Sequence, residues 1–182
     1  MMFARVNMRV DRLLHRFRSG ERGAVAVEFA IVALPFIFIV FSVLELALVM
    51  LLYSTLENGM ADAARTIRTG SLQSAGGATA TSFRNAICAN LGWLQADCLV
   101  NLQVDVRTMS QFTNPSEPDP FTTGTFDSTK VQFTPGAQGS IVLVRAFYQW
   151  PLILPTMNQA LSRNKNGTAI VTAVTTFRNE PY

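Results

Sequence analysis

The feature that most constrains this chain is a long apolar run between Ala24 and Tyr53. Within this run only Glu28 and Glu45 carry charge, and only Pro35 opposes a regular helix. A helix over the run is about 45 Å long, whereas the hydrocarbon core of a bilayer needs roughly 30 Å. A buried core helix of this length would need a larger protein around it than the rest of the chain supplies. The run therefore predicts a membrane-spanning helix.

The balance of charge changes at the start of the apolar run. Residues 1–23 contain six arginines and two acidic residues, a net charge of +4, whereas residues 24–182 contain nine basic and ten acidic residues, a net charge of −1. Arginine and lysine are enriched on the cytoplasmic flank of membrane helices. We therefore expect residues 1–23 to be a basic cytoplasmic leader and the C-terminal part to be exported. Because the excess positive charge belongs to the leader, it gives no reason to expect a nucleic-acid partner.

The small residues that a signal-processing enzyme prefers lie before the apolar run. A secretory signal peptide carries its small-residue cleavage site after its apolar stretch. Here Gly23, Ala24 and Ala26 precede the stretch, and no comparable site follows Tyr53. Any cleavage of the leader is therefore expected on the cytoplasmic side.

The segment from Arg22 to Pro35, RGAVAVEFAIVALP, resembles the N-terminus of TadE-like pseudopilins. These are minor pilins of the tight-adherence (Tad or Flp) branch of type IV pili. The C-terminal sequence FRNEPY, at residues 177–182, is also similar to the end of many such proteins. Residues 18–69 carry most of the resemblance, and the middle of the chain adds little to it.

The resemblance implies a processing site and an assembly signal. In that family a prepilin peptidase cuts after the glycine, which corresponds to the bond between Gly23 and Ala24 here. Glu28 and Phe29 would then be the acidic and aromatic residues near the mature N-terminus, at the positions the family uses. The implied protein has a single pass in the bacterial inner membrane and a periplasmic C-terminal domain, and is incorporated in the pilus or assists it.

The same resemblance implies partners rather than ligands. The expected partners are the prepilin peptidase, other pilins and pseudopilins, the Tad pilus assembly machinery and membrane lipid. No cofactor, metal or nucleic acid is expected.

The resemblance also suggests why Glu28 lies in an apolar helix. Cleavage would create an α-amine at Ala24, and packing mature subunits side by side would bring a neighbour's amine toward Glu28. A carboxylate away from water is tolerated when it is paired with an opposite charge. Glu28 would then set the register of the subunits. The alternative is that Glu28 lies at headgroup depth and reaches water by itself.

Two further residues interrupt the apolar helix. Glu45 falls where the hydrocarbon core ends, roughly twenty residues after Ala24, so we expect it at the outer interface rather than paired with a partner subunit. Pro35 lacks a backbone donor and crowds the carbonyl of Ile31, so we expect the helix to bend there.

An amphipathic stretch continues the helix beyond Tyr53. Apolar residues recur at steps of three or four, which places them on one helical face: Leu52, Leu56, Met60, Ala63 and Ile67. Arg65 and Arg68 complement the helix dipole in the last turn, and Gly70 suits the helix end. One helix over residues 24–69, about 70 Å long, is therefore expected. Its first half lies in lipid, and a small domain covers its second half.

Residues 70–182 predict a small α+β domain of pilin-like architecture. Residues 70–79 form a linker, and a short helix then starts at a cap on Thr81 or Ser82 and ends at Gly92. Strands are expected over residues 100–107, 140–150 and 167–178, with a short edge strand at 130–134 and a helical turn near 157–162. Three or four antiparallel strands would pack on the long helix.

Two details of this domain are specific enough to check. In the first strand, Asp105 belongs to the face that should meet water. A proline-rich loop at about residues 110–139 contains no firm element, which suggests an exposed functional loop or disorder.

The two cysteines, Cys88 and Cys98, lie close together in the exported part. In an oxidising compartment such a pair most often forms a disulfide. Two thiols without further ligands do not make a structural zinc site, and the chain's one histidine, His15, is in the leader.

The lone histidine also opposes an enzyme. Neither a Ser-His-Asp nor a Cys-His arrangement can form in the exported domain, and no phosphate-binding loop motif occurs. Glu117 and Asp119 could act as an acid–base pair, but we expect them to solvate the proline-rich loop. The sequence Asn166-Gly167-Thr168 matches a glycosylation acceptor, although a turn before a strand explains it more simply.

Two classes of function remain. The first is a minor pilin or pseudopilin that is cut after Gly23 and acts in assembly of a tight-adherence pilus. The alternative is an uncleaved, signal-anchored binding module of the inner membrane, in which the Gly-Ala stretch is ordinary small-residue sequence. The identity of the mature N-terminus separates the two.

Overall fold

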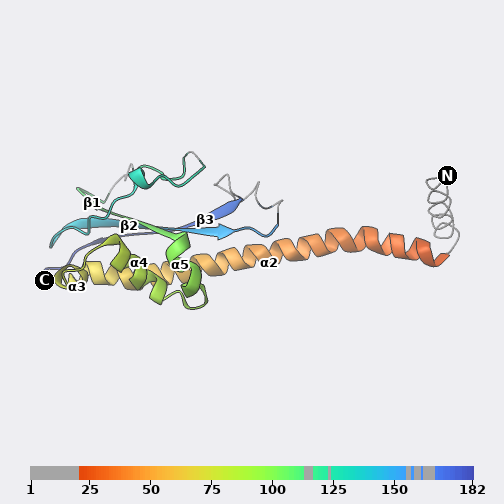
Figure 1. Ribbon diagram of the computed structural model, residues 1–182, viewed down its shortest axis with the longest axis horizontal. Helices are drawn as coiled ribbons and strands as arrows, with labels where there is room; N and C mark the ends of the chain where they lie inside the picture. The colour runs from red at the N-terminus through yellow and green to blue at the C-terminus, as the bar shows by residue number, and fades with distance from the viewer. Residues whose placement is uncertain (1–20, 113–116, 123, 155–156, 158–160, 162–166) are drawn as a thin grey trace, which may run out of the picture. The chain divides into compact units, whose positions relative to one another are not determined.

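The computed structural model describes residues 21–112, 117–122, 124–154, 157, 161 and 167–182. The chain divides into two units, Met1–Leu44 and Glu45–Tyr182, and each is described by itself. The elements are α2 (Glu21–Arg68), α3 (Ser71–Ser74), α4 (Ala80–Ala89), α5 (Gln95–Asn101), β1 (Leu102–Met109), β2 (Ile141–Pro151) and β3 (Thr168–Arg178), with 3-10 turns at Gly92–Leu94 and Ser128–Lys130 (Figure 1).

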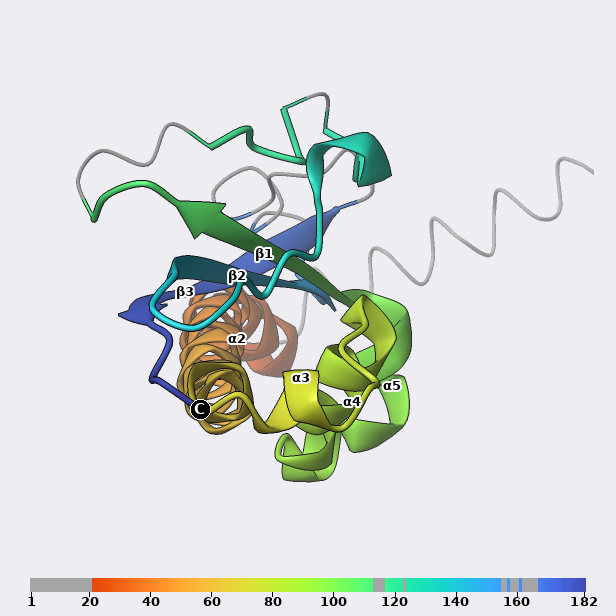
Figure 2. The ribbon, with the colours of Figure 1, turned by 90° about the vertical axis from the view of Figure 1, so that its left-hand side faces the viewer.

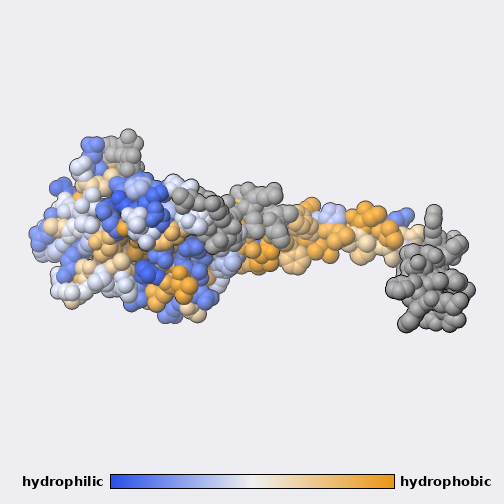
Figure 3. All heavy atoms as spheres, turned by 45° about the horizontal axis from the view of Figure 1, so that its top comes forward, coloured by the Kyte–Doolittle hydropathy of each residue, from blue (hydrophilic) through white to orange (hydrophobic). Residues whose placement is uncertain are grey.

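Helix α2 confirms the expected long helix, with bounds within a few residues of those predicted. Its side chains from Val25 to Leu44 are mostly exposed and apolar, as the orange surface in Figure 3 shows. Among the described residues, this is the one helix long and apolar enough to cross a membrane. The first unit is therefore compatible with a single-pass membrane anchor.

The second half of α2 packs against the sheet and the short helices of the second unit. The predicted apolar stripe is confirmed, because each of its members is almost completely buried: Leu52, Leu56, Met60, Ala63 and Ile67. Helix α4 adds Phe83 and Ile87 to the same core. Figure 2 shows the sheet lying over α2, with α4 and α5 beside the helix.

The sheet has three strands in the order β1-β2-β3, all antiparallel. The strand expected over residues 140–150 is β2, and its central place confirms the prediction made from its apolar residues on both faces. The strand expected over residues 167–178 is β3. Together with α2, the sheet confirms the predicted α+β fold class.

Several element boundaries in the first part of the domain were predicted wrongly. The expected linker at residues 70–79 contains α3, and α4 ends at Ala89 rather than at Gly92. The short helix α4 begins at Ala80, because the side chain of Thr79, rather than Thr81 or Ser82, accepts a hydrogen bond from the Ser82 backbone N–H. The first strand begins at Leu102, because residues 95–101 form α5. Alternation of apolar residues from Val100 onward concealed the end of this helix.

The prediction that one face of the first strand meets water was wrong at Asp105, which is completely buried. The predicted edge strand at 130–134 is reduced to a single parallel bridge between Val106 and Phe133. This bridge holds part of the proline-rich loop against β1. Of the predicted turn near 157–162, only residues 157 and 161 are described, and both are helical. Asn166 lies outside the described residues.

Candidate functional site

The segment with the predicted processing and assembly residues is helical and open to its surroundings. Gly23 lies near the start of α2 and is partly covered, whereas Ala24, Glu28 and Phe29 are exposed. Residues four apart lie on the same face of a helix, so Glu28 lies one turn above Ala24. Pro35 is inside α2. The bend expected there stays a prediction.

The C-terminal residues close over the far end of the same helix. The backbone N–H of Glu180 donates to the carbonyl oxygen of Arg68 at 2.8 Å, which satisfies one of the carbonyls left free at a helix end. The Arg68 side chain donates in turn to the Glu180 carboxylate at 2.9 Å. Gly70 has φ +74°, and a Cβ there would overlap the ring of Tyr182. Two reasons therefore require glycine at the predicted helix end: the positive φ and the lack of space for a side chain.

Asn179 fastens the same tail to the proline-rich loop. Its side chain is 3% exposed and donates to the carbonyl oxygens of Pro135 and Ala137, at 2.9 and 3.0 Å. The C-terminal tail, which carries part of the resemblance to the TadE-like family, is therefore packed against the end of α2 and the proline-rich loop.

A buried carboxylate fixes the rest of the proline-rich loop. Asp105 accepts hydrogen bonds from Arg145 at 2.9 and 2.6 Å, from Arg107 at 2.9 Å, and from the backbone N–H of Gln132 at 2.8 Å. Arg145 lies directly opposite Asp105 in the register of β1 and β2. A buried charge needs partners of this kind, and the sequence showed neither the register nor the loop that supplies them.

The two loop carboxylates considered as an acid–base pair have separate roles. Glu117 forms an ion pair with Arg107 at 2.8 Å, and Asp119 accepts a hydrogen bond from the backbone N–H of Phe121 at 2.9 Å. The expectation that they solvate the loop was incomplete, because Glu117 and Asp119 help to shape it.

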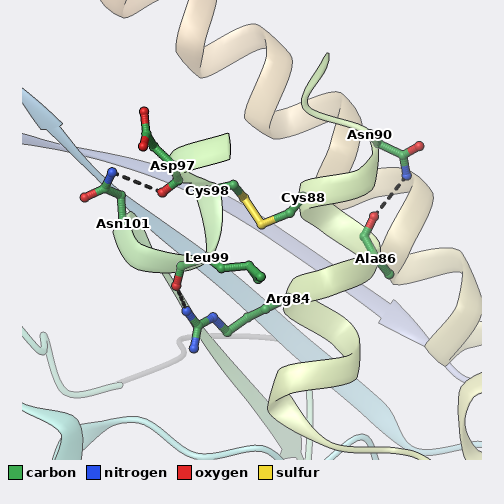
Figure 4. Close-up of a disulfide and its surroundings, with 8 residues drawn as sticks. All are labelled: Arg84, Ala86, Cys88, Asn90, Asp97, Cys98, Leu99 and Asn101. Atoms are coloured by element: carbon green, nitrogen blue, oxygen red, sulfur yellow. Dashed lines mark hydrogen bonds between the residues drawn. A yellow bond between two sulfur atoms is a disulfide. The ribbon is translucent and has the colours of Figure 1, made fainter. Parts of the chain in front are cut away.

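The predicted disulfide between Cys88 and Cys98 is confirmed, with the two Cα atoms 5.6 Å apart. It joins α4 to α5, immediately before β1 (Figure 4). The Arg84 guanidinium donates to the Leu99 carbonyl oxygen beside it. The disulfide therefore fixes the pair of short helices next to the start of the sheet.

Glu45 makes a contact that the sequence did not predict. It is 3% exposed, and its carboxylate accepts hydrogen bonds from the backbone N–H groups of Ile153 and Leu154, which follow β2. Counting back from Leu52 by three and then by four residues leads to Val49 and Glu45. The buried stripe of α2 thus begins at Glu45, and its periodicity was the signal that could have found this contact.

The described residues define a class of protein with one long apolar N-terminal helix, compatible with a membrane anchor, and a small α+β unit that packs on the second half of this helix. The model of the TadE-like protein family matches residues 23–65, which confirms the resemblance seen in the sequence. The match begins at Gly23 and includes Glu28 and Pro35. No curated protein and no solved structure matches the chain. The TadE-like family suggests a minor pilin associated with the Tad pilus.

Proposed function

We propose that this chain is a minor pilin or pseudopilin that acts in assembly of a tight-adherence pilus, as a structural component rather than an enzyme. The observation that carries the proposal is the family match, which begins at Gly23 and follows the apolar helix. The leader would stay in the cytoplasm, as its net charge of +4 favours, and the second unit would lie in the periplasm.

The first step of the proposed function is removal of residues 1–23. A prepilin peptidase would cut between Gly23 and Ala24, at the boundary between the basic leader and the apolar helix. Both residues lie near the start of α2 and outside the packed second unit. A membrane enzyme would therefore reach them without unfolding that unit.

The second step is association with other pilins through the new N-terminus. Cleavage leaves a positive α-amine at Ala24, one helical turn from Glu28. The exposed Glu28 carboxylate is available to pair with this amine or with that of a neighbouring subunit. Such a pair neutralises both charges in an apolar bundle and so favours one axial register between helices.

The mature N-terminus tests this function directly. Mass spectrometry of the protein from native membranes should find a chain that begins at Ala24. A Gly23→Leu variant should stay uncut, since a bulky side chain then replaces the small residue at the cleavage site. Gly20→Leu is the matched control, because it changes the other glycine near this boundary and should leave cleavage intact.

Two results would contradict the proposal. A native chain that begins at Met1 would favour the uncleaved binding module. A chain trimmed after Tyr53 would indicate an ordinary secretory signal.

A further inference from the structure

Apolar side chains are exposed at the end of the second unit where α2 enters it. Ile153, in the turn after β2, is 74% exposed, and Trp93, before α5, is 54% exposed. Leu46 and Leu48, in the first turn of α2 within the second unit, are also exposed. We call these four residues the rim.

Contacts within the second unit bring the rim together. The backbone of Ile153 is bonded to Glu45, next to Leu46. The ring of Trp93 meets that of Trp150 edge to face, with centroids 5.9 Å apart, and Trp150 lies three residues before Ile153. Ile153 thus lies beside α2 close to Leu46, and Trp93 is connected to the end of β2 through Trp150.

Exposed apolar side chains occur along α2 within the second unit as far as Tyr53, which is also exposed. A hydrocarbon core of roughly 30 Å takes about twenty residues of helix. If the core begins at Ala24, the part of α2 from Glu45 to Tyr53 falls at headgroup depth. Tryptophan and tyrosine are enriched at this depth.

Glu45 holds the turn after β2 at this depth. Its buried carboxylate needs hydrogen-bond donors, and the backbone of the turn supplies them. Glu45 accepts from Ile153 and from Leu154, the latter at 3.2 Å. These bonds keep the exposed Ile153 side chain beside the part of α2 that begins at Glu45.

We infer that the rim rests in the headgroup region of the bilayer, with lipid as its partner, and that Glu45 is the positioning residue that holds Ile153 there. The inference rests on the membrane anchor of the proposed function. It adds a second membrane contact, made by the folded unit itself.

The experiment measures the depth of three labelled positions in the full chain. Three variants each add one cysteine, Ile153→Cys, Phe36→Cys or Gln138→Cys, which carries a thiol-linked fluorophore. Cys88 and Cys98 stay joined by their disulfide. All three positions are exposed, so the labels should not disturb the fold. The proteins are reconstituted in vesicles of phosphatidylethanolamine and phosphatidylglycerol that contain lipids brominated either near the headgroup or deep in the acyl chain.

The expected pattern differs at each position. Deep bromines should quench the label at Phe36, shallow bromines should quench the label at Ile153, and neither should quench the label at Gln138. If Phe36 is quenched but Ile153 behaves like Gln138, the rim lies in water and this inference is wrong, although the anchor stands. If Phe36 is not quenched, the anchor and the inference both fail.

A protein partner at the rim would give another result. The label at Ile153 would then be shielded from a water-soluble quencher in native membranes but not in the vesicles. That outcome would overturn the assignment of lipid as the occupant.

The positioning role of Glu45 is tested in the Ile153→Cys background. Glu45→Ala should lose the shallow quenching down to the level seen at Gln138, because the turn is no longer tied to α2. Glu45→Gln should keep it, since an amide oxygen can still accept from both N–H groups. Glu57→Ala is the matched control and should change nothing, because Glu57 is an exposed acid on the same helix. Unchanged quenching in Glu45→Ala would refute the role of Glu45.

Discussion

Replacing Asp105 by alanine should destabilise the second unit more than any other single loss of charge described above. The carboxylate is completely buried, while the side chains of Arg107 and Arg145 are 15% and 12% exposed. Removal of Asp105 leaves two cations with little access to water and one backbone N–H, that of Gln132, without its acceptor. Breaking a buried pair of this kind lowers the free energy of unfolding by about 3–5 kcal/mol.

The separate hydrogen bonds to Asp105 should not be summed to reach a larger value. Arg145 also donates to the Pro118 carbonyl oxygen at 3.1 Å, and Arg107 keeps its ion pair with Glu117. Both arginines thus retain partners when the carboxylate is lost. A double variant, Asp105→Ala with Arg145→Met, should lose less than the sum of the two single variants, by about 0.5–3 kcal/mol, because it removes a cation that Asp105→Ala leaves without its carboxylate.

The assay is urea unfolding of the full chain in detergent micelles, followed by tryptophan fluorescence. Asp127→Ala is the control, because the Asp127 side chain is 34% exposed and its partners Thr129 and Lys130 lie in the same turn. Its unfolding midpoint should move far less. A loss below about 1 kcal/mol for Asp105→Ala would show that water or arginine rearrangement replaces the carboxylate, as it does for exposed pairs, and would refute the reasoning.

Three further predictions concern other parts of the chain. The Glu28→Ala protein should be made, inserted in the membrane and cut, yet fail to co-purify or crosslink with pilus subunits. The unpaired amine at Ala24 disfavours association by about 3–5 kcal/mol in an apolar bundle. A processed variant that associates at the wild-type level would rule out the pairing. Gly70→Ala should lower the midpoint of thermal unfolding, because φ +74° disfavours a side chain and the Tyr182 ring occupies the space. Adding Tyr182→Ala should recover only the part of this loss that comes from overlap with the ring. Full recovery of the midpoint would exclude backbone strain. Burial raises the pKa of Tyr148 above its ordinary value of 10.0. The stabilisation by the neutral phenol is therefore fully present below pH 10.0 and is lost as the pH rises through the raised pKa. Tyr148→Phe should reduce the loss of stability at alkaline pH, and identical pH profiles for the two proteins would contradict this assignment.

The periodic features of the chain could be predicted from sequence because each depends on local spacing. The stripe from Leu52 to Ile67 required only a helical period, and the strands β2 and β3 required only apolar runs between prolines and glycines. The disulfide followed from the proximity of Cys88 and Cys98 in the chain. In each case the residues that interact are near one another or share one element.

The features that were missed depend on pairs that are far apart in sequence. Asp105 meets Arg145 only because β1 and β2 adopt one register, and alternation alone assigned it to a wet face. Glu45 meets Ile153 only because the turn after β2 returns to the start of the second unit. The sequence showed that Asp105 and Glu45 are acidic residues among apolar ones, but it did not show the groups that pair with them.

The burial of α2 within the second unit has a mechanical consequence. From Leu52 to Ile67 the helix packs along the core of this unit, so a force that pulls on this part of the helix along its axis acts on all of its packed residues. The stripe lies parallel to the helix axis, and the end of the helix is held through Arg68 and Glu180. Sliding the helix past the sheet would therefore break all these contacts together rather than one after another. A subunit built in this way resists extraction by shear and shares the load among every contact along the helix.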